Sequence, residues 1–247
     1  MTMTGLILGT GSNAAYIEKA ERVLRWGDAE GKGHQGFVLM DPEMGAFGDN
    51  GCIDFIKTEW DKKLDEESLL PGSFTYEKYF AGKYLGELVR LAFMTALERA
   101  EQDVPQYLKD KDSFTTSDVS GILSTSEKPE VAKNLTGTQL ATLQYICQLY
   151  SERAALLVSL TIATFLNRMA RPEEAVVAVT GNKVKVKFLS FLFPLGSLYK
   201  HHPLLPQRLD YHTSKLTSFP FCYKLSDDGS GKGAGLVAAI VSRLKSS

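Results

Sequence analysis

The run from Ala175 to Thr180, AVVAVT, limits the possible folds of this chain more than any other segment. Its unbroken small and β-branched apolar residues are typical of a strand buried on both faces, in a sheet covered by helices. Two long stretches with helical apolar spacing precede it, at 76–102, with a break near Gly82, and at 138–170. The order of strands, helix, helix, strand and helix therefore favours an α/β fold.

Shorter segments add strands and loops. Residues 5–9 and 14–18 predict a hairpin around a Gly-Thr-Gly turn, and residues 36–41 predict a further short strand. Residues 110–130, rich in Asp and Ser, predict a loop, and the charge run WDKKLDEESLL predicts a solvated surface.

Composition excludes several classes of protein. The chain has 247 residues, 44% hydrophobic, and its 28 basic and 29 acidic residues leave a net charge of -1. Such a balance gives no basic excess for nucleic acid or an anionic membrane. The apolar run Ala154 to Leu166 is shorter than the roughly 20 residues of a membrane span, so we expect a buried helix and no transmembrane segment.

Cysteine and histidine usage indicates neither a disulfide framework nor a metal site. Cys52, Cys147 and Cys222 are widely spaced and form no CxxC pair, which suits a reducing cytoplasm. The histidines lack metal-ligand spacing, and we expect those of YKHHPLLPQR to lie at the surface. No signal peptide is recognisable at the N-terminus.

The Gly9-Thr10-Gly11 turn and two acids give the first functional signal. A glycine turn after an apolar strand lets backbone N–H groups approach an anion, although alone it predicts only a hairpin. Glu43 precedes a Gly-Ala-Phe-Gly turn and Glu77 begins a helix, and either acid alone predicts a solvated or capping carboxylate. Together with the Asn13 amide, these carboxylates could form hydrogen bonds to the hydroxyl groups of a sugar.

Four ordered motifs extend this signal over nearly the whole chain: GLILGTGSNAAYIE, EMGAFGDNG, LLPGSFTYEKYFAGKYLGELVRL and DDGSGKGAGLVAAIV. They resemble the large domain of eukaryotic hexokinases. The resemblance implies an actin-like (ribonuclease H-like) sugar-kinase fold, with residues 1–247 forming the large lobe only. It also implies transfer of the γ-phosphoryl group of ATP, with Mg²⁺, to the 6-hydroxyl of a hexose such as glucose, mannose or fructose. Another sugar-kinase family of the same fold fits these motifs less well.

The resemblance assigns roles residue by residue. It implies sugar binding by Asn13, Glu43 and Glu77. The positions that it implies for ATP binding are Gly9, Thr10, Gly82, Lys83, Thr116, Ser120, Ser197, Leu198, Tyr199 and Lys200. The segment GSGKGAGL, residues 229–236, would open the last helix near the adenosine, and its lysine lacks the Walker spacing.

Departures from the family pattern bear on activity. The D-x-G-G-T loop, the N-D-T-x-G-T stretch with its catalytic Asp and the small N-terminal domain do not occur here. We expect that Asp upstream of Met1, no catalytic residue within this chain, and little activity of the chain alone. A catalytically dead sugar-binding or regulatory protein is the alternative. Within the motifs, Asp41 and Met44 replace the usual Asn and Trp, and Phe74 replaces a frequent Gln.

An apparent insertion interrupts the adenosine segment. Removing about residues 182–196 rejoins VVAVTG to SLYK, as in the family pattern. Either a natural loop or a retained intron accounts for it, and the intact flanks favour the intron. The sequence does not define the oligomeric state.

Overall fold

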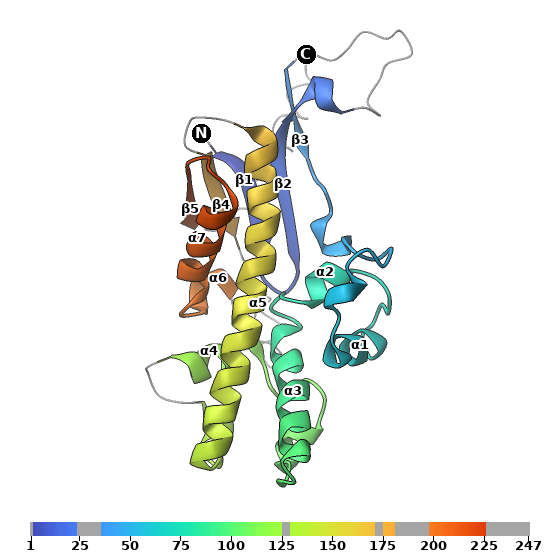
Figure 1. Ribbon diagram of the computed structural model, residues 1–247, viewed down its shortest axis with the longest axis vertical. Helices are drawn as coiled ribbons and strands as arrows, with labels where there is room; N and C mark the ends of the chain where they lie inside the picture. Colours follow the sequence, from blue (N-terminus) through green and yellow to red (C-terminus); the bar gives the residue numbers. More distant parts are fainter. Residues whose placement is uncertain (1, 24–35, 125–128, 171–174, 181–197, 226–247) are drawn as a thin grey trace, which may run out of the picture.

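The computed structural model describes residues 2–23, 36–124, 129–170, 175–180 and 198–225. Its centre is a five-stranded mixed sheet of order β3-β2-β1-β4-β5 (Figure 1). The strands are β1 (Thr2–Leu8), β2 (Ser12–Lys19), β3 (Phe37–Met40), β4 (Ala175–Thr180) and β5 (Phe221–Leu225). β2 pairs antiparallel with both β1 and β3, whereas β4 lies parallel to β1 and β5. The predicted α/β class, hairpin and two further strands are confirmed, and β5 adds a strand that the sequence pattern did not predict.

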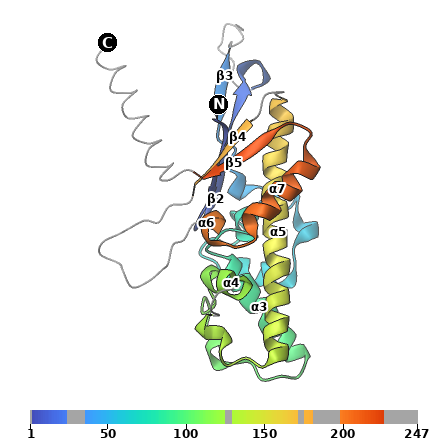
Figure 2. The same cartoon turned by 90° about the vertical axis from the view of Figure 1, so that its left-hand side faces the viewer.

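Helices make up most of the remaining described fold. They are α1 (Glu59–Glu66), α2 (Thr75–Lys78), α3 (Leu85–Arg99), α4 (Thr116–Leu123), α5 (Gly137–Met169), α6 (Leu198–His201) and α7 (Leu205–Leu216). Short 3-10 turns occur at Ala20–Arg22, Met44–Ala46, Asp54–Ile56, Gln106–Lys109 and Glu130–Ala132. Figure 2 shows α5 and α7 together on one face of the sheet.

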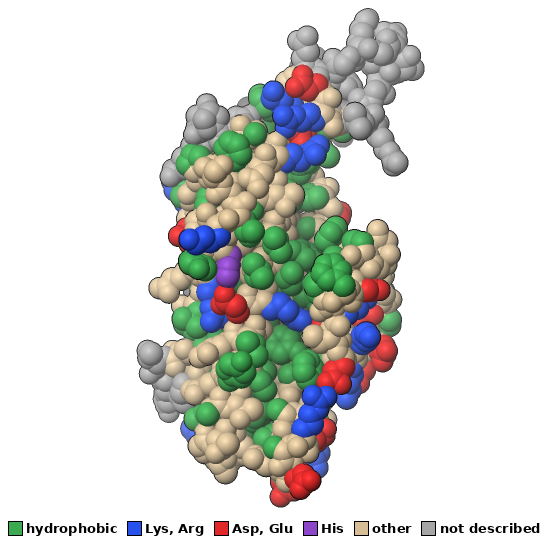
Figure 3. Space-filling model, in the orientation of Figure 1, with side chains coloured by type: hydrophobic (Ala, Val, Ile, Leu, Met, Phe, Trp, Pro, Cys, Tyr) green, Lys and Arg blue, Asp and Glu red, His purple; other side chains and the backbone are tan. Residues whose placement is uncertain are grey.

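Helix α5 is the main core element. Its start is fixed by Thr136, whose hydroxyl accepts a 3.2 Å hydrogen bond from the backbone N–H of Gln139 in a capping box. On its inner face, Phe165 stacks on Tyr16 of β2 with ring centroids 4.6 Å apart. It is long and apolar enough to cross a membrane, but 61% of its most apolar window is buried inside the protein. The predicted buried helix is thus confirmed, although its outward face still exposes hydrophobic side chains (Figure 3), among them Tyr145 and Leu149.

Strand β4 is fully buried on one face and partly buried on the other. Ala175, Val177 and Val179 are buried on one face, while on the other face Val176 and Ala178 are partly covered and Thr180 is buried. Burial on the second face is therefore less complete than expected, because α5 and α7 cover the same face of the sheet.

The predicted helix at 76–102 is two helices, α2 and α3, separated by a turn. The break falls at residues 79–84, where the Gly82 amide turns back to bond the hairpin. The expected loop at 110–130 contains α4, which begins at the capping box of Thr115 and Asp118. That capping signal was present in the sequence.

Two groups predicted to lie at the surface are buried. Asp61, in the charge run, is 4% exposed because it receives two 2.8 Å hydrogen bonds from the Arg153 guanidinium. His202 is 2% exposed, with Nε2 2.8 Å from the Ser151 hydroxyl on α5. Both predictions failed because the partner lies on a distant segment of the chain. The neighbouring His201 is exposed, as expected.

Candidate functional site

The β1–β2 turn is joined to the segment before α3. The Gly82 amide donates to the Gly9 carbonyl at 2.8 Å, and the Lys83 amide donates to the Thr10 carbonyl at 3.0 Å. A Cβ at Gly82 would lie 2.6 Å from the Gly9 carbonyl oxygen, so only glycine allows this approach. Four positions predicted for ATP therefore lie together, although two distant segments of the chain supply them.

Thr116, at the start of α4, joins the same cluster. Its hydroxyl donates to the Gly82 carbonyl at 2.8 Å and accepts from the Gly86 amide at 3.1 Å. One turn later, the Ser120 hydroxyl donates to the Thr116 carbonyl at 3.1 Å. The Thr116 hydroxyl thus holds the turn before α3 in place.

Glu77 lies against the same hairpin. Its carboxylate accepts a 2.7 Å hydrogen bond from the amide of Ser12, the first residue of β2. A Cβ on Gly11 would come within 2.9 Å of the Glu77 carboxylate, and one on Gly45 within 3.4 Å of the Glu77 side chain. Glycines on two turns therefore make room for this carboxylate.

Asn13 connects the hairpin to the turn that carries Glu43. Its Nδ2 donates to the Asp41 carboxylate at 3.0 Å, and its Oδ1 accepts from the Met44 amide at 3.2 Å. Asp41 also accepts from the Glu43 amide at 3.1 Å. Glu43 itself is exposed, and its backbone is left-handed with φ 48°. The three residues predicted for sugar binding are thus carried by adjoining segments that are bonded to one another.

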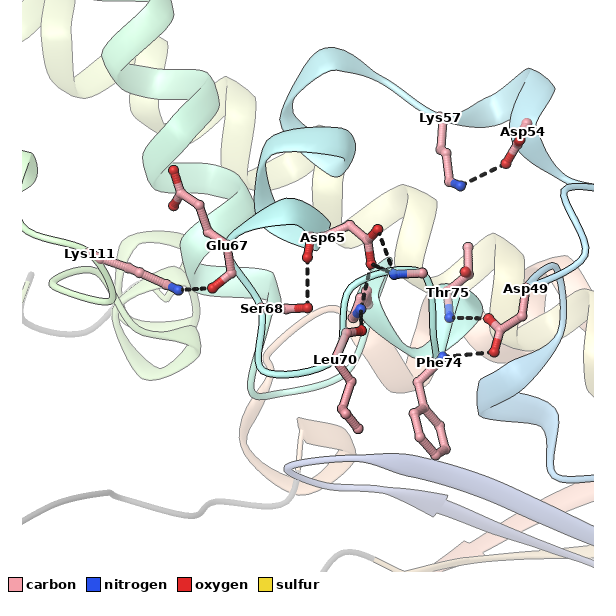
Figure 4. Close-up of polar contacts among 12 residues, drawn as sticks. Asp49, Asp54, Lys57, Asp65, Glu67, Ser68, Leu70, Phe74, Thr75 and Lys111 are labelled. Atoms are coloured by element: carbon pink, nitrogen blue, oxygen red, sulfur yellow. Dashed lines mark hydrogen bonds and ion pairs between the residues drawn. The ribbon is translucent and has the colours of Figure 1, made fainter.

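The loop that leads into α2 is fixed by two further acids (Figure 4). Asp49 accepts from the amides of Phe74 and Thr75 at 3.0 and 2.8 Å. Asp65 accepts from Lys78 Nζ at 2.5 Å, and the same ammonium group donates to the Leu70 carbonyl at 2.6 Å. These contacts set the position of α2, and hence of Glu77.

Burial and hydrogen bonding act oppositely on two of these carboxylates. Burial raises the pKa of Glu77 above its usual range, although the Ser12 amide and the nearby Lys83 and Lys78 charges oppose the rise. Burial would also raise the pKa of Asp49, but hydrogen bonds from Thr75 and Phe74 outweigh it and leave that pKa below its usual range. Ionisation of these two acids therefore affects stability in opposite directions.

The arrangement suits a phosphate beside a polyol. Among the described residues, the amides of Thr10 and Gly11 donate no backbone hydrogen bond, so the turn keeps donors for an anion. The carboxylates of Glu43 and Glu77 complement hydroxyl donors, because an ionised carboxylate only accepts. In the described part of the chain, no group of three or more His, Cys, Asp or Glu side chains could hold a metal ion.

The remaining predicted positions are only partly covered. Leu198 is buried at the start of α6. Ser197, the suspected insertion at 182–196 and the segment 229–236 lie outside the described residues, as do the side chains of Tyr199 and Lys200.

Sequence reasoning missed the residues that position the site. Asp49, Asp65 and Lys78 gave no local signal of a role, and Asp65 falls in a charge run that predicts solvated surface. The contact between the Ser12 amide and Glu77 was also missed, because its partners are 65 residues apart.

Comparisons with known proteins show which family the chain resembles. The hexokinase family model matches residues 3–240. Hexokinase-1 of Mus musculus is 35% identical over 252 residues, covering 97% of this chain and 24% of that protein. Hexokinase-2 of Rattus norvegicus is 36% identical over 255 residues, covering 97% of this chain and 26% of that protein.

Solved structures show the same relationship. The structure of hexokinase from Schistosoma mansoni complexed with glucose matches with a TM-score of 0.79 and 33% identity, over 96% of this chain and 53% of that chain. Another hexokinase structure, 22% identical with a TM-score of 0.70, supports the fold alone.

The fold is therefore the actin-like sugar-kinase fold predicted from the motifs. The chain belongs to the hexokinase family. It spans about a quarter of the length of the curated relatives that it matches.

Proposed function

We propose that this chain forms the large lobe of an ATP-dependent hexokinase of the cytoplasm and provides its sugar-binding and nucleotide-binding surface. The reaction is transfer of the γ-phosphoryl group of Mg²⁺-bound ATP to the 6-hydroxyl of a hexose. Glucose is the first substrate to test, with mannose and fructose as others. The Schistosoma mansoni structure is a complex with glucose, which supports that choice.

The β1–β2 hairpin gives the strongest support for this function. It bonds Gly82 and Lys83 through the carbonyls of its turn and bonds Glu77 through the Ser12 amide. A phosphate at the turn and a sugar at the carboxylates would consequently be neighbours. Phosphoryl transfer depends mainly on such positioning.

Each group has a defined task in this proposal. Glu43 and Glu77 accept hydrogen bonds from sugar hydroxyls, and Asn13 holds the Glu43 turn while adding an amide. Gly9 and Thr10 face the phosphates, and Lys83 adds positive charge beside them. Mg²⁺ would enter with ATP and neutralise phosphate charge.

A coupled kinase assay tests the proposal on the longest natural protein that contains this chain. Glu43→Ala and Glu77→Ala should each raise the KM for glucose and lower kcat, because charge-assisted hydrogen bonds are lost. A loss of about 1.5–3 kcal/mol corresponds to roughly ten- to a hundredfold in kcat/KM. Glu59→Ala, at an exposed carboxylate paired with Arg99, is the matched control.

The outcomes separate three possibilities. Near-normal kcat/KM in both variants would contradict the sugar site. Binding of glucose without turnover in the longest natural protein would indicate the catalytically dead alternative. Loss of activity in Glu59→Ala as large as in the two variants would show that the effects are not specific to the site.

A further inference from the structure

Phe74 combines backbone strain with an exposed ring beside the candidate sugar site. Its φ is 55°, in the left-handed region that residues with a Cβ rarely adopt, and the residue is 39% exposed. It immediately precedes α2, whose Glu77 bonds the β1–β2 hairpin.

The surrounding contacts impose this conformation. The Phe74 amide donates to Asp49 at 3.0 Å, and its carbonyl accepts from the Lys78 amide at 3.2 Å. Figure 4 shows the ring pointing away from Asp49, toward the side on which the β1–β2 hairpin lies. The backbone is therefore held by its own bonds, and the ring faces the side of the candidate site.

We propose that Phe74 forms an apolar wall of the hexose site and stacks on one C–H face of the sugar. This inference rests on the proposed function. A pyranose has a polar edge of hydroxyl groups and two faces of C–H bonds, and small-molecule sites combine an aromatic surface with a few convergent polar groups. Glu43 and Glu77 would bind the hydroxyl edge of the sugar, while Phe74 would contact one of its C–H faces.

Stacking on the Phe74 ring would limit which sugars the site binds. Stacking requires that no hydroxyl project axially from the covered face, so the site favours pyranoses with equatorial hydroxyls, as in glucose. An axial hydroxyl on that face would separate the aromatic ring from the sugar. Phe74 is thus a specificity-determining residue, distinct from the carboxylates that hold the edge.

Saturation-transfer NMR on this 247-residue chain with glucose tests the inference, because the method detects weak binding. Saturation of the protein should reach the axial protons of one sugar face more strongly than those of the other. Phe74→Leu should remove this bias and weaken binding by roughly two- to tenfold, the range of one aromatic contact. Phe74→Tyr should keep both, since the ring remains.

Phe55→Leu is the matched control, because Phe55 is 85% exposed and follows Asp54, which Figure 4 places away from Phe74. Thermal melts establish that each variant is folded. Glucose binding with equal saturation of both faces, or binding unchanged in Phe74→Leu, would overturn the stacking inference and leave the proposed function standing. Absence of glucose binding in the wild-type chain would overturn both.

Discussion

The Ser12 amide donates a 2.7 Å hydrogen bond to the Glu77 carboxylate, and this bond connects the β1–β2 hairpin to α2. Ser12 opens β2, and Glu77 lies in α2, so each end of the contact belongs to its own local element. The hydrogen bond between them places the β1–β2 hairpin and α2, the two parts of the candidate site, next to each other.

Glu77→Gln should make the chain more stable at neutral pH while weakening glucose binding. Burial raises the pKa of Glu77, so the folded state favours the protonated form, and ionisation costs stability as pH rises through that raised pKa. Thermal melts between about pH 4 and pH 8 should show the gain at neutral pH and its disappearance in acid. A lower Tm of the variant at neutral pH would contradict this assignment.

Gly82→Ala should destabilise the chain by about 1–3 kcal/mol, as overpacking does. Its Cβ would lie 2.6 Å from a backbone oxygen, which cannot move aside as a flexible side chain would. Urea unfolding measures the loss. Gly137→Ala is the control, because nothing lies within 4 Å of the new Cβ, and it should be neutral or slightly stabilising. Equal losses in the two variants would refute the close approach at Gly82.

Asp49→Ala should cost about 0.5–2 kcal/mol, because α2 loses the acceptor for two amides at its start. The pKa of Asp49 is lowered, so its contribution is complete above the usual aspartate pKa and lost as pH falls through the lowered value. Asp49→Asn keeps one acceptor and should lose less. Chemical denaturation at several pH values measures both effects, and equal stability of the alanine variant and wild type would rule out the capping role.

His202→Gln should make the free energy of unfolding depend less on pH in the acid range. Burial, with a contribution from the Arg208 charge, lowers the pKa of His202 from 6.5 to about 4. The unfolded chain binds a proton before the folded chain does, so wild-type stability falls as pH drops from 6.5 to about 4. The free energy of unfolding in urea, plotted against pH across that window, should be steeper for wild type. Identical slopes would show that His202 does not titrate in this way.

The sequence predicted the elements whose formation depends on the spacing of neighbouring residues. The apolar run of β4, the hairpin and the length of α5 follow from residue spacing, and Gly82 marked the break between α2 and α3. The motifs also placed Glu43 and Glu77 in one candidate site. The burial of His202 and Asp61 was not predictable in this way, because each depends on a partner from α5, and a charged or titratable residue alone predicts surface.

Glucose should bind where the β1–β2 hairpin meets α2, and amide chemical-shift mapping of this chain reports such binding residue by residue. Titration with glucose should shift the amides of Ser12, Asn13, Glu43 and Glu77 together, with one common Kd. The same titration of Glu77→Ala should give much smaller shifts. Shifts confined to other segments, or unchanged affinity in Glu77→Ala, would contradict a sugar site at this junction.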